Sequence, residues 1–218
     1  MALANPLLDE FNKIVVVRRS GNLGFTGLNA YTNDTVQREN HDNELMALTN
    51  YRTSDPKNAK LEPIFRHPYR RGVMRDISLS FDAKKIMYSS ILENGRWGVF
   101  EIDLNGKNLN VLTPTDQPDV DWYDSCYLPE SPYIVSASTA GIQGLPCENG
   151  GRVMVNLYRV NTKTKETRQL TFEQDSDWHP TVMHNGQVMY LRWEYTEDRK
   201  STRLNSSHPT TSRMPSSA

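Results

Sequence analysis

The sequence predicts an all-β protein that forms part of a β-propeller, with four-stranded antiparallel blades, about three of them and part of another. Two observations carry this prediction. A pattern of short β-rich strands separated by polar turns recurs after 45 residues and again after 56, and a period of this length with four strands is typical of a propeller blade. In addition, no amphipathic stretch is long enough for a substantial helix.

Three segments begin in the same way, with an aspartate, a short strand, a polar turn and a second β-rich strand. They start at Asp76, Asp121 and Asp177. The turn of the third segment contains Asn185-Gly186, and Asn-Gly is favoured in tight hairpins because both central residues need a positive φ. We expect each aspartate to mark the opening of the innermost strand of a blade.

A second hairpin follows in the first two segments. Residues 98–103 and 109–113 form the hairpin after Asp76, and residues 155–160 and 167–171 form the one in the next segment. Apolar and polar residues alternate in these strands, as expected for half-buried strands, and both hairpins end in Leu-Thr. The second period is longer because a glycine-rich loop is inserted before its second hairpin.

The N-terminal part fits an earlier, irregular blade. We expect strands at residues 13–18, 44–49 and 61–65, and the first of these is a continuous β-branched run. The polar residues 21–43 are expected to form a long loop. A β-sandwich also produces short alternating strands and is the alternative fold, but the recurrence of aspartate and of Leu-Thr at a similar period favours the propeller.

The C-terminal residues differ in composition from the rest of the chain. DRKSTRLNSSH at 198–208 and SRMPSSA at 212–218 resemble a translated sequencing adapter, with three residues between them in the place of a variable barcode. A Ser/Thr-rich linker is the alternative. We therefore assign residues 1–197 to a β-propeller fragment and residues 198–218 to a non-native, disordered tail.

Composition argues against several classes of protein. The formal net charge is −1, so there is no basic excess of the kind that nucleic-acid binding requires. The longest aliphatic run, Ile14 to Val17, is far shorter than the ~20 residues of a membrane span. Two cysteines are too few for a disulfide scaffold or for a zinc site built from cysteines alone. We expect no nucleic-acid partner and no membrane span.

Several motifs resemble known propeller families. The repeat that runs from aspartate to Leu-Thr resembles the WD40-like blades of the TolB type. Residues 11–19, 121–129, 178–186 and 188–195 resemble the hydrazine synthase alpha-subunit middle-domain family, and this resemblance extends over nearly all of residues 9–197. It implies a large, secreted, bacterial-type protein, in the periplasm or outside the cell, in which a propeller lies among other domains.

The resemblance does not carry haem chemistry to this chain. Attachment of c-type haem needs a Cys-x-x-Cys-His motif, whereas Cys126 and Cys147 are 21 residues apart and neither is followed by a histidine. We expect no cofactor. The leading hypothesis is a non-enzymatic binding or scaffold module, whose partners are other domains or blades of the same full-length protein and a protein or carbohydrate ligand.

The sequence is also compatible with two other functions. One is part of an enzyme with its active site at the propeller mouth, and the other is a fragment of a haem-containing oxidoreductase subunit. No catalytic residue is assigned, because the sequence has no serine nucleophile elbow, no phosphate loop and no HExxH motif.

A ligand is expected at one rim of the propeller channel, near the openings of the inner strands. The candidate residues come from two of these openings and from one following strand: Tyr123, Asp124, Trp178, His179 and Arg192. They combine an acid, a base, a cation and aromatic faces, which suit a polar ligand. The alternative is structural, with Asp124 capping a turn and His179-Pro180 fixing the start of a strand. If the rim site exists, Asp124 and His179 should be partly exposed at the same end of adjacent blades.

The two cysteines have two possible states. In an oxidising compartment Cys126 and Cys147 would form a disulfide that fixes the inserted loop. Alternatively both are free thiols, with Cys126 packed in the core of its blade. No metal site is expected, because His179 and His184 are five residues apart on a strand and therefore point to opposite faces.

Overall fold

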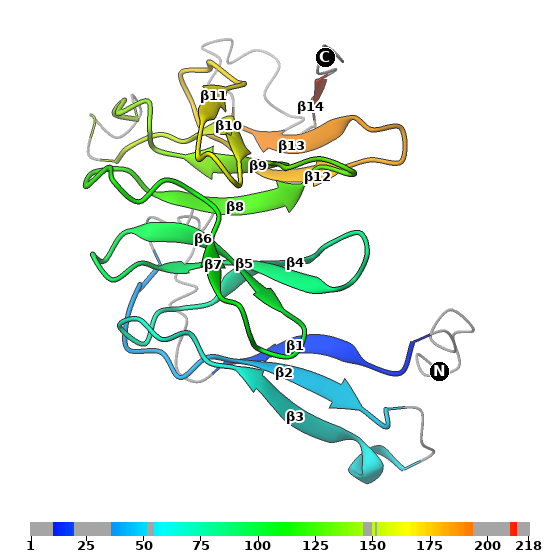
Figure 1. Cartoon of the computed structure of the whole chain (residues 1–218). Helices are drawn as coiled ribbons and strands as arrows, with labels where there is room; N and C mark the ends of the chain where they lie inside the picture. Colours follow the sequence, from blue (N-terminus) through cyan, green and yellow to red (C-terminus); the bar gives the residue numbers. More distant parts are fainter. Residues whose placement is uncertain are drawn as a thin grey trace, which may run out of the picture.

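The fold is described by a computed structural model over residues 11–19, 36–51, 55–145, 150, 152–193 and 210–212. Within these residues, fourteen strands form four antiparallel sheets, and one 3-10 turn is present at Pro56–Asn58. The sheets follow one another along the chain like neighbouring propeller blades (Figure 1). The prediction of a nearly all-β partial propeller is confirmed.

The second and third sheets each have four strands, and in both the strand order follows the chain order. The second sheet consists of β4 (Arg75–Leu79), β5 (Lys85–Ile91), β6 (Trp97–Asp103) and β7 (Asn110–Val111). The third consists of β8 (Trp122–Tyr127), β9 (Tyr133–Ser138), β10 (Asn156–Asn161) and β11 (Thr167–Gln169). Both correspond to the predicted pair of consecutive hairpins.

The first and fourth sheets each have three strands among the described residues. The first consists of β1 (Ile14–Arg18), β2 (Glu44–Thr49) and β3 (Lys60–Phe65), at or within one residue of the predicted bounds. The fourth consists of β12 (Asp177–Val182), β13 (Val188–Arg192) and β14 (Thr210–Ser212).

The third strand of the fourth sheet comes from the segment that we expected to be a tail. The backbone of β14 pairs with β13 from Tyr190 opposite Thr210 to Val188 opposite Ser212. The other residues of 198–218 lie outside the described part of the chain. The assignment of this segment to a non-native tail therefore stays a prediction.

Apolar side chains fill the spaces between neighbouring sheets. Met87, Val99 and Trp122 belong to a buried cluster that joins the second and third sheets. Leu157 and Trp178 belong to a larger cluster that joins the third and fourth. Burial of these side chains supplies the main stabilising free energy of the arrangement, and it fixes how the inner strands lie relative to one another.

The repeated Leu-Thr has a structural explanation. The hydroxyl oxygen of Thr113 accepts the backbone N–H of Val99 at 3.2 Å, and that of Thr171 accepts the N–H of Leu157 at 2.9 Å. In both blades this hydrogen bond holds the outermost segment of the blade against the third strand. The preceding leucine donates its own N–H to the same third-strand residue.

The innermost strand of each of the last three sheets contains a β-bulge. The pairing register shifts in β4, β8 and β12, and one residue in each bulge has a left-handed backbone, namely Asp76, Asp124 and His179 with φ near 51°, 51° and 53°. These three residues are therefore structural equivalents. Few non-glycine residues adopt this conformation, and aspartate and histidine are among those enriched in it.

This equivalence corrects the alignment of the repeated aspartates. Asp76 lies at a bulge, whereas Asp121 lies just before β8 and Asp177 is the first residue of β12. The true counterpart of Asp121 is Ser176, because each side chain accepts a backbone N–H at the start of the third strand of the preceding sheet. The donor is Trp97 of β6 at 3.0 Å for Asp121 and Val155, next to β10, at 3.3 Å for Ser176. The three repeated aspartates therefore occupy different positions relative to the bulges.

Candidate ligand groove

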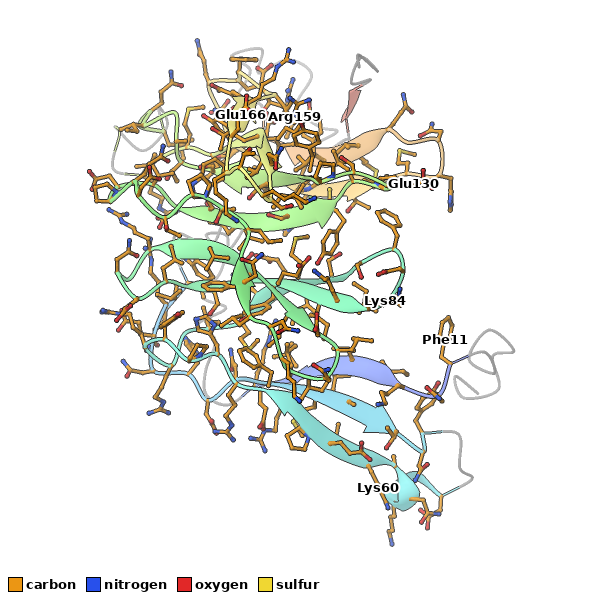
Figure 2. The ribbon with its side chains drawn as sticks, in the orientation of Figure 1. Phe11, Lys60, Lys84, Glu130, Arg159 and Glu166 are labelled. Atoms are coloured by element: carbon orange, nitrogen blue, oxygen red, sulfur yellow. The ribbon has the colours of Figure 1, made fainter. Side chains whose placement is uncertain are left out.

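A groove of about 330 Å³ runs along the inner strands β4, β8 and β12. It is lined by residues 76–79, 81, 124–127 and 179–182, so all three bulges open onto it. Figure 2 shows Lys84 and Glu130, which follow β4 and β8, on the same side of the molecule. Since β4 and β8 run in the same direction, the groove has one end at the starts of the inner strands and the other at their ends.

Asp124 and His179 meet in this groove. The Nδ1 atom of His179 lies 2.9 Å from Oδ2 of Asp124, and the backbone N–H of His179 donates to the same oxygen at 2.6 Å. The His179 side chain is 46% exposed, whereas that of Asp124 is 11% exposed. The two residues thus meet between adjacent blades, but only the imidazole is well exposed, whereas the rim hypothesis expected both side chains to be partly exposed.

Electrostatics at the groove favour the charged form of His179. The hydrogen bond to the Asp124 carboxylate raises the pKa of His179 above its ordinary value, and burial opposes this effect. The charge of Asp76 also raises the pKa of His179, whereas that of Arg75 lowers it. Because Nδ1 faces a carboxylate, we assign the proton of the neutral imidazole to Nδ1, which leaves Nε2 as an acceptor.

Ser125 and Cys126 follow Asp124 in the groove lining. The hydroxyl of Ser125 is buried and has no hydrogen-bond partner among the described residues. Cys126 is a buried, free thiol, and burial raises the pKa of Cys126 to about 12, so the thiol is protonated at neutral pH. Cys147 lies outside the described residues, so the choice between the disulfide and two free thiols stays a prediction.

The other three candidate residues lie away from the groove. Tyr123 and Trp178 are only 1% and 8% exposed and belong to the core between sheets. Tyr123 packs edge-on against Trp97, with ring centroids 6.0 Å apart. Tyr123 and Trp178 come directly before the bulge residues of their strands, and their side chains point between the sheets rather than into the groove.

Arg192 also has a different role from the one expected. Its Nε lies 3.0 Å from Oδ1 of Asp177, and its Nη1 lies 2.9 Å from Oε1 of Glu173. The Asp177 side chain is fully buried, so Arg192 neutralises a buried carboxylate within the fourth sheet. It does not contact Asp124 or His179 in the described contacts.

Asp121 serves the joint between the second and third sheets. Its carboxylate accepts hydrogen bonds from Arg38 at 3.0 and 3.3 Å and from the backbone N–H of Trp97 at 3.0 Å. The Nη1 atom of Arg96 lies 3.6 Å from Oδ2 of Asp121. The Asp121 side chain is only 6% exposed, and its partners are these groups of the joint rather than groove residues.

Sequence reasoning missed several residues of the groove. The repeat identifies Asp76 only as a strand opening and gives no signal for Ser125, Leu79 or Phe81. Leu79 and Phe81 are 47% and 65% exposed and lie toward the ends of the inner strands. These residues could be identified by counting along the sequence from a bulge residue. The position of a bulge, however, cannot be located from the spacing of residue types alone.

Outside the groove, His67 is a core residue and not a candidate for acid–base chemistry or metal binding. His67 is buried, its Nδ1 lies 3.1 Å from the Tyr88 hydroxyl, and its Nε2 lies 2.7 Å from the Ile91 carbonyl oxygen. Desolvation lowers the pKa of His67 to about 4, so it is a neutral core histidine. Within the part of the chain that the structure describes, no three His, Cys, Asp or Glu side chains are grouped to hold a metal ion. Among the same residues, no helix is long and apolar enough to span a membrane.

The fold is similar to those of solved β-propeller proteins. Hydrazine synthase from Kuenenia stuttgartiensis matches with a TM-score of 0.60 and 12% identity over 83% of this chain and 28% of that one. A puromycin-hydrolyzing peptidase from Mycobacterium tuberculosis matches with a TM-score of 0.51 and 7% identity over 84% and 26% of the two chains. TolB from Agrobacterium tumefaciens matches with a TM-score of 0.47 and 13% identity over 68% and 49%.

These comparisons define the class of the protein as a β-propeller. The resemblance to hydrazine synthase that the sequence suggested is supported at the level of the fold. The chain spans 28% of the hydrazine synthase chain and 26% of the peptidase chain. No protein-family model and no curated protein matches the sequence.

Proposed function

We propose that this chain is a non-enzymatic binding and scaffold module of a larger secreted protein, located in the periplasm or outside the cell. The observation that carries the proposal is the groove along β4, β8 and β12, into which three equivalent bulge residues open. Concave surfaces that combine apolar lining with a few polar groups are the usual form of a ligand site. Other blades or domains of the same protein would be its structural partners.

The state of the groove residues supports binding rather than covalent catalysis. A nucleophile needs a base within hydrogen-bond reach or a lowered pKa. The Ser125 hydroxyl has no hydrogen-bond partner among the described residues, so it is not paired with the imidazole of His179. The Cys126 thiol has a raised pKa. Neither group is activated for attack on a substrate.

One observation favours a second candidate, an enzyme whose active site lies at the propeller mouth. A carboxylate that holds the Nδ1–H of a histidine leaves Nε2 available as a general base, and Asp124 and His179 have this arrangement. Such an enzyme would act on water or on a substrate hydroxyl rather than through Ser125 or Cys126.

A fragment screen by NMR on the full chain distinguishes the two candidates. Under the binding proposal, fragments shift the amide signals of Ser125 and His179, and their own signals stay unchanged over time. Conversion of ester, amide or glycoside fragments that is lost in His179→Gln would instead establish the enzyme. If no fragment shifts the groove amides while the chain is folded, the groove is not a ligand site.

A further inference from the structure

Three polar atoms of the groove have hydrogen-bonding capacity that the described residues leave unused. Ser125 is 7% exposed, and its buried hydroxyl lacks a partner. Asp124 uses Oδ2 for both of its bonds to His179, so Oδ1 keeps its lone pairs. The neutral imidazole of His179 offers Nε2 as an acceptor. A buried hydroxyl without a partner costs folding free energy, which a ligand that reaches it would recover.

These three atoms select one kind of ligand group. Asp124 Oδ1 and His179 Nε2 only accept hydrogen bonds, and the Ser125 hydroxyl can accept or donate. A group that satisfies all three must supply several N–H donors. A protonated amine has three donors and no acceptor, and its charge also complements the Asp124 carboxylate. An alcohol can donate only once, and a carboxylate cannot donate at all.

The other end of the groove is apolar. Leu79 and Phe81 are exposed large side chains in its lining, next to the end of β4, and Val182 lines it at the end of β12. Exposed apolar side chains that gather at a concave surface indicate a binding site. The polar atoms lie at the bulges, near the starts of the inner strands. The groove therefore changes from polar to apolar along its length.

We propose that the groove between β4, β8 and β12 binds a ligand in which a protonated amine is joined to an apolar group. The amine lies against Asp124, Ser125 and His179, and the apolar group lies against Leu79 and Phe81. This inference rests on the proposed binding function and specifies its ligand class.

Three small probes with the same phenyl ring test the ligand class. They are 2-phenylethylamine, 2-phenylethanol and phenylacetate, titrated into the full chain and followed by amide shifts in NMR spectra. At a pH above the His179 pKa, the amine stays protonated because alkyl ammonium groups titrate near about 10. We expect the amine to bind about 10- to 100-fold more tightly than the alcohol, because its hydrogen bonds involve charged groups, and phenylacetate not to bind.

The outcomes separate this inference from the proposed function. Equal or tighter binding of the alcohol or of phenylacetate in the groove would overturn the ligand class and leave the binding function in place. The same holds if other fragments bind in the groove and the amine does not. If no probe and no fragment binds in the groove, both the ligand class and the proposed binding function are wrong.

A pair of serine variants tests the assigned contacts. Ser125→Ala should weaken binding of 2-phenylethylamine about tenfold without lowering the free energy of unfolding, because the removed hydroxyl has no partner to leave unpaired. Ser136→Ala is the matched control, since the fully buried Ser136 hydroxyl on β9 donates to the Tyr123 carbonyl at 3.1 Å outside the groove lining. It should lower stability and leave amine binding unchanged. Unchanged binding in Ser125→Ala would contradict the assignment.

The pH dependence gives an independent readout. The charges that act on His179 are Asp124 on β8 and Asp76 and Arg75 on β4. When His179 gains a proton, Nε2 becomes a donor and repels the ammonium group, so amine binding should weaken as the pH falls through the His179 pKa. By linkage, bound amine should lower the pKa of His179. An affinity that stays constant across this pH range, or a His179 pKa that the amine does not move, would overturn the proposed contact.

Discussion

Two aspartates at the start of the same inner strand have opposite roles. Asp121 lies before the β8 bulge and contacts Arg38, Arg96 and the backbone of Trp97, all on the side of the preceding sheets. Asp124 lies at the bulge and contacts His179 of the following sheet inside the groove. In β8, therefore, the residue before the strand joins the blade to the preceding sheets, and the bulge residue lies in the groove.

The largest effect is expected from removing the joining carboxylate. Asp121→Ala would leave Arg38 and the N–H of Trp97 without their acceptor in a nearly buried site, and breaking a buried pair in this way costs about 3–5 kcal/mol. Urea unfolding measures the loss. Asp119→Ala is the control, because Asp119 also pairs with Arg96 but is 79% exposed, and its loss should stay within about 0.5 kcal/mol. Equal losses in the two variants would contradict the joining role.

The threonines of the two complete blades should have intermediate and similar effects. Thr113→Val and Thr171→Val each leave a buried backbone N–H of the third strand without its hydroxyl acceptor, so each should lower the free energy of unfolding by about 1–3 kcal/mol. Thr115→Val, in an exposed position two residues from Thr113, should change little. A loss in only one of the two blades would show that Leu-Thr does not have the same role in both.

The contact between His179 and Asp124 should make stability depend weakly on pH. The pKa of His179 is raised in the folded protein, so its contribution is fully present below about 6.5, the unfolded value. It is lost as the pH rises through the folded pKa. Because the imidazole is 46% exposed, the contribution should be about 1 kcal/mol or less. Unfolding curves measured across this range for His179→Gln should lack this component, and an identical pH dependence in the variant would count against the contact.

The smallest effect is expected from deleting residues 198–218. If this segment is a non-native tail, a chain that ends at Glu197 should have the same melting temperature as the full chain. The pairing of β14 with β13 makes this a real test, because a lower melting temperature would show that the segment contributes to the fourth sheet.

The sequence was sufficient to predict the strands of the first 197 residues and the blade architecture, but not β14. Each hairpin has a local signal, such as the β-branched run of β1 or the Asn185-Gly186 turn, and Leu-Thr marks the same hydrogen bond in both complete blades. These features depend on neighbouring residues or on one short-range contact. They can therefore be identified from the order of residue types.

The sequence was not sufficient to predict which residues face the groove. Asp124 and His179 were expected near each other, and they are in contact, but Tyr123 and Trp178 are buried between sheets. A bulge inserts one residue and reverses the alternation of side chains beyond it. Its position is set by the pairing with the neighbouring strand, so the faces of residues such as Ser125 follow only from the structure.

The most direct test of this account is the pKa of His179 in the folded chain, measured by NMR titration of its imidazole protons. We expect a pKa above 6.5, the ordinary value, because the Asp124 carboxylate stabilises the imidazolium. In Asp124→Asn the pKa of His179 should fall toward or below the ordinary value. A wild-type value at or below 6.5 that Asp124→Asn leaves unchanged would show that the two residues do not meet, and with that the groove assigned to the inner strands would be wrong.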